Sequence, residues 1–181
     1  MPATTSLLCA RRAQPSFPHW HSERRMPTHA EQRVLPYTAE QLFDLVADVD
    51  RYPEFLPWCV GARIRERRDT LIVADLLIGF RMFRERFTSR VTLARPRRID
   101  VAYSEGPFRY LENHWIFEPV EGGCRTDFFV DFEFRSRVLQ TLIGALFNEA
   151  VRRMVAAFET RARHLYGLPG IASERPQTDV T

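Results

Sequence analysis

Apolar residues in the last third of the chain recur at i, i+3, i+4 and i+7, the spacing of an α-helix with one wide buried face. They are Leu139, Leu142, Ile143, Leu146, Phe147, Ala150, Val151, Met154, Val155, Phe158, Ala162 and Leu165. Ser136 suits the N-cap position, and Gly167 followed by Pro169 suits the end of a helix. The pattern predicts one helix over residues 137–167. At about 1.5 Å per residue it is about 45 Å long, and its apolar face needs a covering surface.

Between residues 60 and 134 the period changes to two, which is typical of strands with one buried face. In the last part of this region Phe128, Val130, Phe132 and Phe134 alternate with mostly polar residues. Six strands are predicted, over residues 60–66, 71–78, 83–93, 98–104, 108–117 and 125–134. Because glycine, proline and charged residues mark short turns between them, we expect an antiparallel meander.

Three shorter elements precede the meander. Residues 28–35 are predicted as a strand that ends before a proline. Thr38 and Gln41 have the spacing of a capping box, so a short amphipathic helix is expected to begin there. Residues 50–59 contain two prolines, which forbid a continuous helix, and several aromatic residues that need cover. This segment is predicted as a second short helix or a tight bend packed inward.

The element order predicts an α+β helix-grip fold, in which a curved antiparallel sheet wraps around the long C-terminal helix. A twisted sheet cannot touch a straight helix along its whole length, so a gap lined by aromatic residues is expected. The chain has 14 phenylalanines and 12% aromatic residues. These side chains either fill the gap or leave a cavity for a ligand.

The two ends of the chain have a different composition. Residues 1–25 have three prolines, four arginines, one acid and no apolar periodicity, so we expect a disordered leader. It resembles a mitochondrial transit peptide, or else Met26 is the true start. The folded domain is expected over residues 26–167, followed by a disordered tail at 168–181.

Composition narrows the function classes. The 181 residues with 45% apolar content suit one domain, and a net charge of +3 argues for neither nucleic acid nor membrane as a partner. The three cysteines are widely spaced without a CxxC pair, so neither a disulfide framework nor a metal site is predicted. Apolar runs are far shorter than the roughly 20 residues of a membrane span.

Several motifs in a fixed order identify a family resemblance. They are Tyr-Pro-Glu-Phe-Leu-Pro-Trp-Cys at 52–59, Gly-Phe at 79–80, Gly-Pro-Phe at 106–108, Trp-Ile-Phe at 115–117, Phe-Glu-Phe at 132–134, Met-Val-Ala-Ala-Phe-Glu-Thr-Arg-Ala at 154–162 and Leu-Tyr-Gly at 165–167. Together they resemble the coenzyme Q-binding START-domain family, which also carries polyketide cyclase/dehydrase-like and ribosome-association-toxin names. The resemblance covers about residues 26–167.

The resemblance implies a cavity that holds ubiquinone or another polyprenyl lipid. The protein would be a lipid chaperone that supports respiratory electron transport, with no enzymatic activity and no cofactor besides the bound lipid. It also implies an alternative, a toxin that binds the large ribosomal subunit and blocks subunit joining. DNA is not an expected partner. In a bacterium the protein would be cytoplasmic and peripheral to the inner membrane, whereas a transit peptide would make it mitochondrial.

The predicted ligand-binding residues are flat aromatic or thioether side chains, which suit a quinone ring and a prenyl tail. They are Tyr52, Phe55, Trp58, Phe108, Trp115, Phe147, Met154 and Phe158. A separate membrane contact is predicted at Phe80, Met82 and Phe83, where apolar residues at a turn are flanked by arginines. The alternative is that the strands continue through this point and these residues belong to the core.

No GxSxG, HExxH, Walker or GxGxxG motif is present, so no catalytic residue is predicted. Either His114 or Asn113 should face the cavity, since they are neighbours in a strand. Asp75 and Glu85 lie in otherwise apolar strands and are either cavity carboxylates or residues at an edge or beside an arginine.

Basic residues gather at two predicted turns. They are Arg63, Arg65, Arg67 and Arg68 at the first turn and Arg95, Arg97 and Arg98 at the second. They indicate either an electropositive edge that binds RNA or a solvated strand edge protected against aggregation.

Overall fold

The computed structural model describes residues 28–80 and 83–167. Its elements, in chain order, are β1 (Thr28–Leu35), α1 (Ala39–Ala47), a 3-10 turn (Val49–Arg51), α2 (Tyr52–Phe55), β2 (Cys59–Arg68), β3 (Leu71–Phe80), β4 (Phe83–Ala94), β5 (Arg98–Glu105), β6 (Phe108–Val120), β7 (Gly123–Phe134) and α3 (Arg137–Tyr166). The seven strands form one antiparallel sheet in the order β1-β7-β6-β5-β4-β3-β2. The predicted α+β helix-grip fold is therefore confirmed. The predicted leader and tail lie outside the described residues.

All the predicted strands and the long helix are present, with ends that differ by a few residues. β6 and β7 extend to a tight turn at Gly122 and Gly123, which both have positive φ. A side chain at Gly123 would collide with the carbonyl oxygen of Leu35, so this turn requires glycine next to β1. Residues 50–59 form the predicted bend, as part of the 3-10 turn, the one-turn helix α2 and a tight turn that leads into β2, in which the Cys59 amide donates to the Leu56 carbonyl at 3.1 Å.

The capping box that the sequence predicts begins α1. The Gln41 amide donates to the Thr38 hydroxyl at 3.2 Å, and the Thr38 amide donates to the Gln41 side-chain oxygen at 2.9 Å. These two bonds satisfy backbone donors that the first turn of a helix otherwise leaves unpaired. The cap thus fixes where α1 leaves β1 and turns over the sheet.

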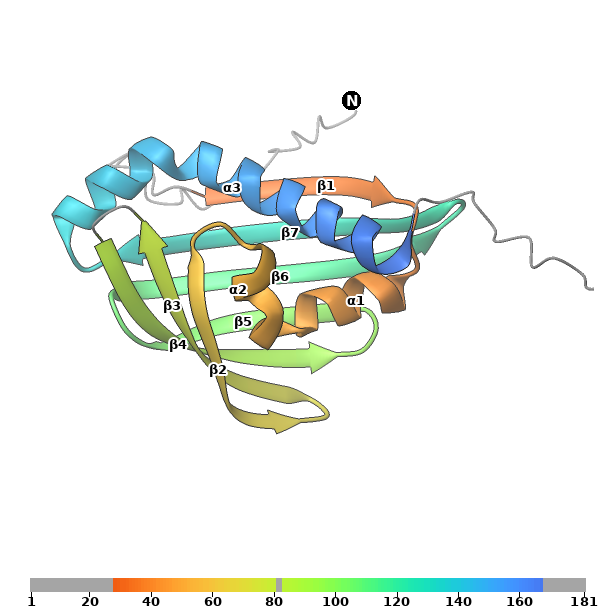
Figure 1. Cartoon of the computed structure of the whole chain (residues 1–181), viewed down its shortest axis with the longest axis horizontal. Coiled ribbons are helices and arrows are strands. Elements are labelled where there is room, and N and C mark those ends of the chain that lie inside the picture. The colour runs from red at the N-terminus through yellow and green to blue at the C-terminus, as the bar shows by residue number, and fades with distance from the viewer. Residues whose placement is uncertain (1–27, 81–82, 168–181) are drawn as a thin grey trace, which may run out of the picture.

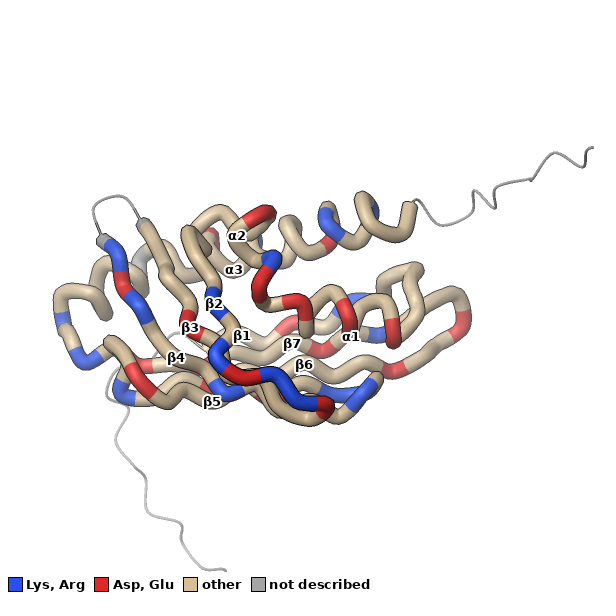
Figure 2. The backbone as a smooth tube through the Cα atoms, turned by 60° about the horizontal axis from the view of Figure 1, so that its bottom comes forward, with Lys and Arg blue, Asp and Glu red and all other residues tan. Residues whose placement is uncertain are grey.

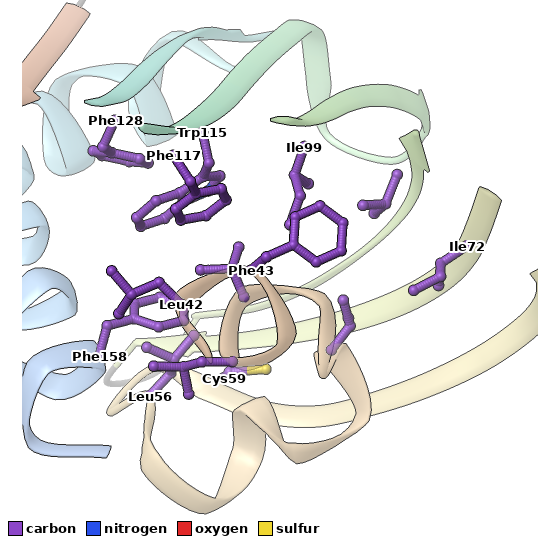
Figure 3. Close-up of a cluster of buried hydrophobic side chains, with 14 of the residues drawn as sticks. Leu42, Phe43, Leu56, Cys59, Ile72, Ile99, Trp115, Phe117, Phe128 and Phe158 are labelled. Atoms are coloured by element: carbon purple, nitrogen blue, oxygen red, sulfur yellow. The ribbon is translucent and has the colours of Figure 1, made fainter. Parts of the chain in front are cut away.

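All the helices lie on one face of the sheet. Figure 1 shows α3 running lengthwise over the strands, with α1 and α2 beside its C-terminal half. α1 is held to the sheet by Phe43, whose ring meets that of Phe117 at 6.0 Å, and both side chains are buried (Figure 3). α1 is held to α3 by the Tyr166 hydroxyl, which donates to the Gln41 carbonyl at 2.9 Å. This end of the domain is filled with side chains, whereas the space under the middle of α3 is not.

Candidate functional site: an aromatic cavity under the long helix

A cavity of about 300 Å³ lies between the sheet and α3. Strands β3 to β7 and α3 contribute most of its wall, and residues from α1 to the start of β2 close one side. The wall is largely aromatic and aliphatic. No charged side chain belongs to it among the residues that the structure describes. It is therefore suited to an apolar ligand.

The alternation of the strands places these side chains in the cavity. On β7, Phe128, Val130, Phe132 and Phe134 all line it, as the period of two requires. On the neighbouring strand β6, Trp115 pairs in register with Phe128, and their ring centroids are 4.4 Å apart. The period-two alternation that predicts the strands thus also determines which of their side chains line the cavity.

Seven of the eight predicted ligand-binding residues lie in the cavity wall. They are Tyr52, Trp58, Phe108, Trp115, Phe147, Met154 and Phe158. The eighth, Phe55, lies behind the wall, where its ring contacts that of Phe158 at 5.1 Å and that of Tyr52 at 5.8 Å. The Arg161 guanidinium lies 5.6 Å from the ring centroid of Phe55. Phe55 therefore supports two wall residues and does not itself reach the cavity.

A cluster of rings around Phe108 was only partly predicted from the sequence. Phe108 contacts Phe87 at 5.3 Å, Tyr103 at 5.5 Å, Phe132 at 5.7 Å and Phe134 at 4.6 Å. Three of its neighbours, the phenylalanines, also line the cavity. Their inward alternation was a usable signal, because every one of them has the strand parity of a buried position.

The wall contains a few polar side chains. The Tyr52 hydroxyl donates to the Val46 carbonyl at 2.6 Å, and burial raises the pKa of Tyr52, so this phenol stays neutral. Ser89 donates to the Ala74 carbonyl at 3.5 Å, and the Asn113 amide donates to the Phe129 carbonyl at 2.9 Å. Asn113 is thus the member of the predicted pair that faces the cavity. His114 points to the opposite face, where its ring stacks on Phe129 at 4.8 Å.

Asp75 and Glu85 are not among the wall residues, so the interpretation of either as a cavity carboxylate is wrong. Asp75 belongs to the outer face of β3, where it accepts hydrogen bonds from Arg65 at 2.8 Å, Arg86 at 2.8 Å and Thr88 at 2.7 Å. Burial alone would raise the pKa of Asp75, but these hydrogen bonds and the two positive charges outweigh it and lower the pKa. The arginine-partner interpretation is therefore correct for Asp75, whereas Glu85 forms no ion pair with a described residue.

Similarity to known proteins identifies the family of this chain. A family model described as polyketide cyclase/dehydrase and lipid transport matches residues 35–159. The chain belongs to this family. The START-like resemblance found in the sequence is thereby confirmed.

Relatives within the family have names from two function classes. The ribosome association toxin RatA of Pseudomonas aeruginosa is 38% identical over 144 residues, which cover 78% of this chain and 100% of that protein. The mitochondrial coenzyme Q-binding protein COQ10 homolog B of Xenopus laevis is 35% identical over 144 residues, covering 77% of this chain and 59% of that protein.

Solved structures support the same fold. An 18 kDa protein from Caulobacter crescentus is 39% identical, with a TM-score of 0.65. The match covers 79% of this chain and 100% of that chain. The Zhui aromatase/cyclase from Streptomyces has a TM-score of 0.68 over 78% of this chain and 96% of that chain. Because the two sequences are only 17% identical, this likeness is evidence for a shared fold alone.

Within this family member, most arginines of the two predicted basic turns are paired with acids. The ion pairs are Arg65 with Asp75, Arg67 with Asp50, Arg68 with Glu66, Arg95 with Asp44 and Arg98 with Asp100. Arg63 and Arg97 have no acidic partner in the described part of the chain, and neither do Arg84 and Arg90 on β4. Figure 2 shows blue segments on β2 and β4, on either side of β3.

The predicted membrane turn coincides with a hairpin. β3 ends at Phe80 and β4 begins at Phe83, and these two residues pair in register. Met82 lies outside the described residues, so contact with a membrane stays a prediction. None of the described helices has the length and apolarity needed to cross a bilayer.

Proposed function

We propose that this chain binds an isoprenoid quinone, such as ubiquinone, or a similar polyprenyl lipid in the cavity and carries it without catalysing a reaction. The observation behind the proposal is the apolar cavity under α3. Its volume of about 300 Å³ is at the lower end of the roughly 300–1,000 Å³ that small-molecule sites occupy. A quinone ring with the first part of its tail suits such a space better than a whole long-chain lipid.

The chemistry of the wall supports a lipid with an uncharged head. Rings and aliphatic groups offer a large contact area to a flat ring and a branched hydrocarbon tail. A phosphate or carboxylate buried there would lack a cationic partner among the described wall residues, which is costly in an apolar site. The coenzyme Q-binding name of the Xenopus relative agrees with this ligand class.

A carrier role agrees with the groups that the wall offers. Acid–base or nucleophilic catalysis needs a titratable group near the reacting atoms. The polar groups of the described wall are Ser89, Asn113, the neutral Tyr52 and two indoles, and no carboxylate or imidazole is among its lining residues. The nearest imidazole, that of His29, lies behind Phe128 and Phe147, with ring centroids at 6.1 and 6.4 Å. We therefore propose a lipid chaperone that supports respiration, with the lipid as its ligand and with no separate cofactor or metal.

The first test of lipid binding enlarges a side chain of α3 so that it occupies the cavity. Ala150 lines the cavity, whereas Ala156 is exposed on the same helix. Ala150→Phe should weaken binding of a short-tailed ubiquinone about tenfold or more, because the added ring occupies the ligand's space. Ala156→Phe should leave it unchanged. Titration followed by tryptophan fluorescence measures both, and equal affinity in the two variants would contradict the cavity as the site.

A second candidate function, association with the large ribosomal subunit, rests on a different surface. Arg63, Arg84 and Arg90 are exposed on strands β2 and β4 and have no acidic partner among the described residues. They lie on the outer face of the sheet, away from the cavity, as their register with Asp75, Gly79 and Val73 shows. The RatA names of relatives at 38% identity favour this candidate.

Co-sedimentation with large ribosomal subunits over a salt series tests this candidate. Changing Arg63, Arg84 and Arg90 to glutamine should weaken co-sedimentation. The slope of the logarithm of the binding constant against the logarithm of the salt concentration should become shallower by about one unit per lost phosphate contact. The matched control changes Arg51, Arg152 and Arg153, which are exposed and paired with glutamates on helices, and should have little effect. Absence of sedimentation, or equal effects of both triple variants, would count against ribosome association.

We also propose that the β3–β4 hairpin touches an anionic membrane surface during lipid transfer, so that the protein is peripheral to a membrane. The support is the sequence, in which Phe80, Met82 and Phe83 are flanked by arginines at the hairpin turn. Changing Phe80 and Met82 together to serine should abolish binding to anionic liposomes at an unchanged melting temperature. A variant that keeps full liposome binding would exclude this hairpin as the contact.

A further inference from the structure

Three side chains with polar atoms face the otherwise apolar cavity from the inner face of the sheet. Ser89 lies on β4, and Asn113 and Trp115 lie on β6. Strand β5 connects them, because its Val101 pairs with Val91 on one side and Asn113 on the other, while Ile99 pairs with Trp115 and Tyr103 with Ser89. All three therefore face the cavity from adjacent rows of the sheet.

Each of the three has hydrogen-bonding capacity that the described protein does not use. The indole N–H of Trp115 has no acceptor among the described residues, although the side chain is only 8% exposed. Ser89 is 1% exposed, and its bond to the Ala74 carbonyl, at 3.5 Å, is at the limit of a hydrogen bond. Asn113 uses one amide hydrogen for the Phe129 carbonyl, which leaves its side-chain oxygen and a second N–H.

Unused donors in a buried wall are unfavourable unless a partner satisfies them. Tyr52, in the same wall, shows the usual solution, since its hydroxyl has a protein acceptor at 2.6 Å. Ser89 has only a long bond, Trp115 has none among the described residues, and Asn113 has a good partner for just one of its two N–H groups. A ligand oxygen is the simplest group that satisfies them, because an indole N–H and a serine O–H both donate to a carbonyl oxygen.

We propose that Ser89, Asn113 and Trp115 form a polar seat for the oxygen-bearing head of the bound lipid. The inference rests on the proposed lipid-binding function and adds an orientation and a selectivity to it. The head lies against strands β4 to β6, and the tail lies along the wall residues of α3, such as Phe147 and Met154. Because Asn113 can donate and accept, the seat takes both a carbonyl head and its reduced hydroxyl form.

The seat also predicts which lipids are excluded. A plain polyprenyl hydrocarbon fills the same apolar space but leaves the three polar groups unsatisfied, so it should bind more weakly than a quinone of similar size. Fatty acids and phospholipids bring a negative charge for which the described wall has no cation. Selectivity for a neutral, oxygenated head thus follows from three side chains.

The test compares a short-tailed ubiquinone with farnesene, a 15-carbon isoprenoid hydrocarbon without oxygen, by displacement of an apolar fluorescent probe. Asn113→Leu, Ser89→Ala and Trp115→Phe should each lower quinone affinity about tenfold or somewhat less and leave farnesene affinity unchanged. The matched controls are Asn148→Leu and Ser104→Ala, which change exposed side chains outside the cavity wall and should affect neither ligand.

The outcomes separate this inference from the proposed function. If neither quinone nor farnesene binds the unaltered protein, the proposed function fails, and the seat fails with it. If both bind equally well, or if the variants weaken both equally, the cavity binds lipid but the polar seat is overturned. A measurement on the unaltered chain guards against variants that fail to fold. In NMR spectra the Trp115 indole N–H signal should move downfield when the quinone is added and stay in place when farnesene is added, and the opposite result would overturn the seat.

Discussion

The fold depends on a mismatch in shape between a curved sheet and a straight helix. α3 can contact the sheet closely only over part of its length, and the α1 side is filled by residues such as Phe43, Phe117 and Ala162. Under the middle of α3, rings from β6 and β7 meet Phe147 and Phe158 around a space that protein atoms do not fill. Close packing of an interior is the rule, so the unfilled apolar space of about 300 Å³ is the feature on which the proposal of lipid binding rests.

The same inward alternation explains why so much was predictable from the sequence. Period-two positions on β4, β6 and β7 mark the inner face, and α3 has the matching helical stripe, so seven of eight proposed wall residues are correctly placed. Phe55 was misplaced because helical and strand periodicity cannot resolve a one-turn helix, which here contains Pro53 and is followed by Pro57. The pairing of β1 with β7 was not predicted either, since most of β1 is exposed and carries little pattern.

Asp75 shows a different limit. The segment around it is apolar on both sides, so the sequence does not reveal which parity faces the cavity. The structure places Ile72, Ala74 and Leu76 inside and leaves Asp75 outside, where arginines from β2 and β4 hold it. Likewise, the ion pairs that occupy Arg67 and Arg95 depend on Asp50 and Asp44, which are distant in sequence.

The two proposed functions assign different parts of this molecule. The lipid proposal uses the inner face of the sheet, and the ribosome proposal uses the outer face, where arginines without an acidic partner among the described residues lie. The central claim concerns the inner face, and mass spectrometry of organic extracts from the purified full chain tests it most directly. We predict a polyprenyl quinone or a similar neutral lipid that is absent from extracts of Ala150→Phe. Extracts that repeatedly contain no such lipid, together with no uptake of added ubiquinone, would contradict it.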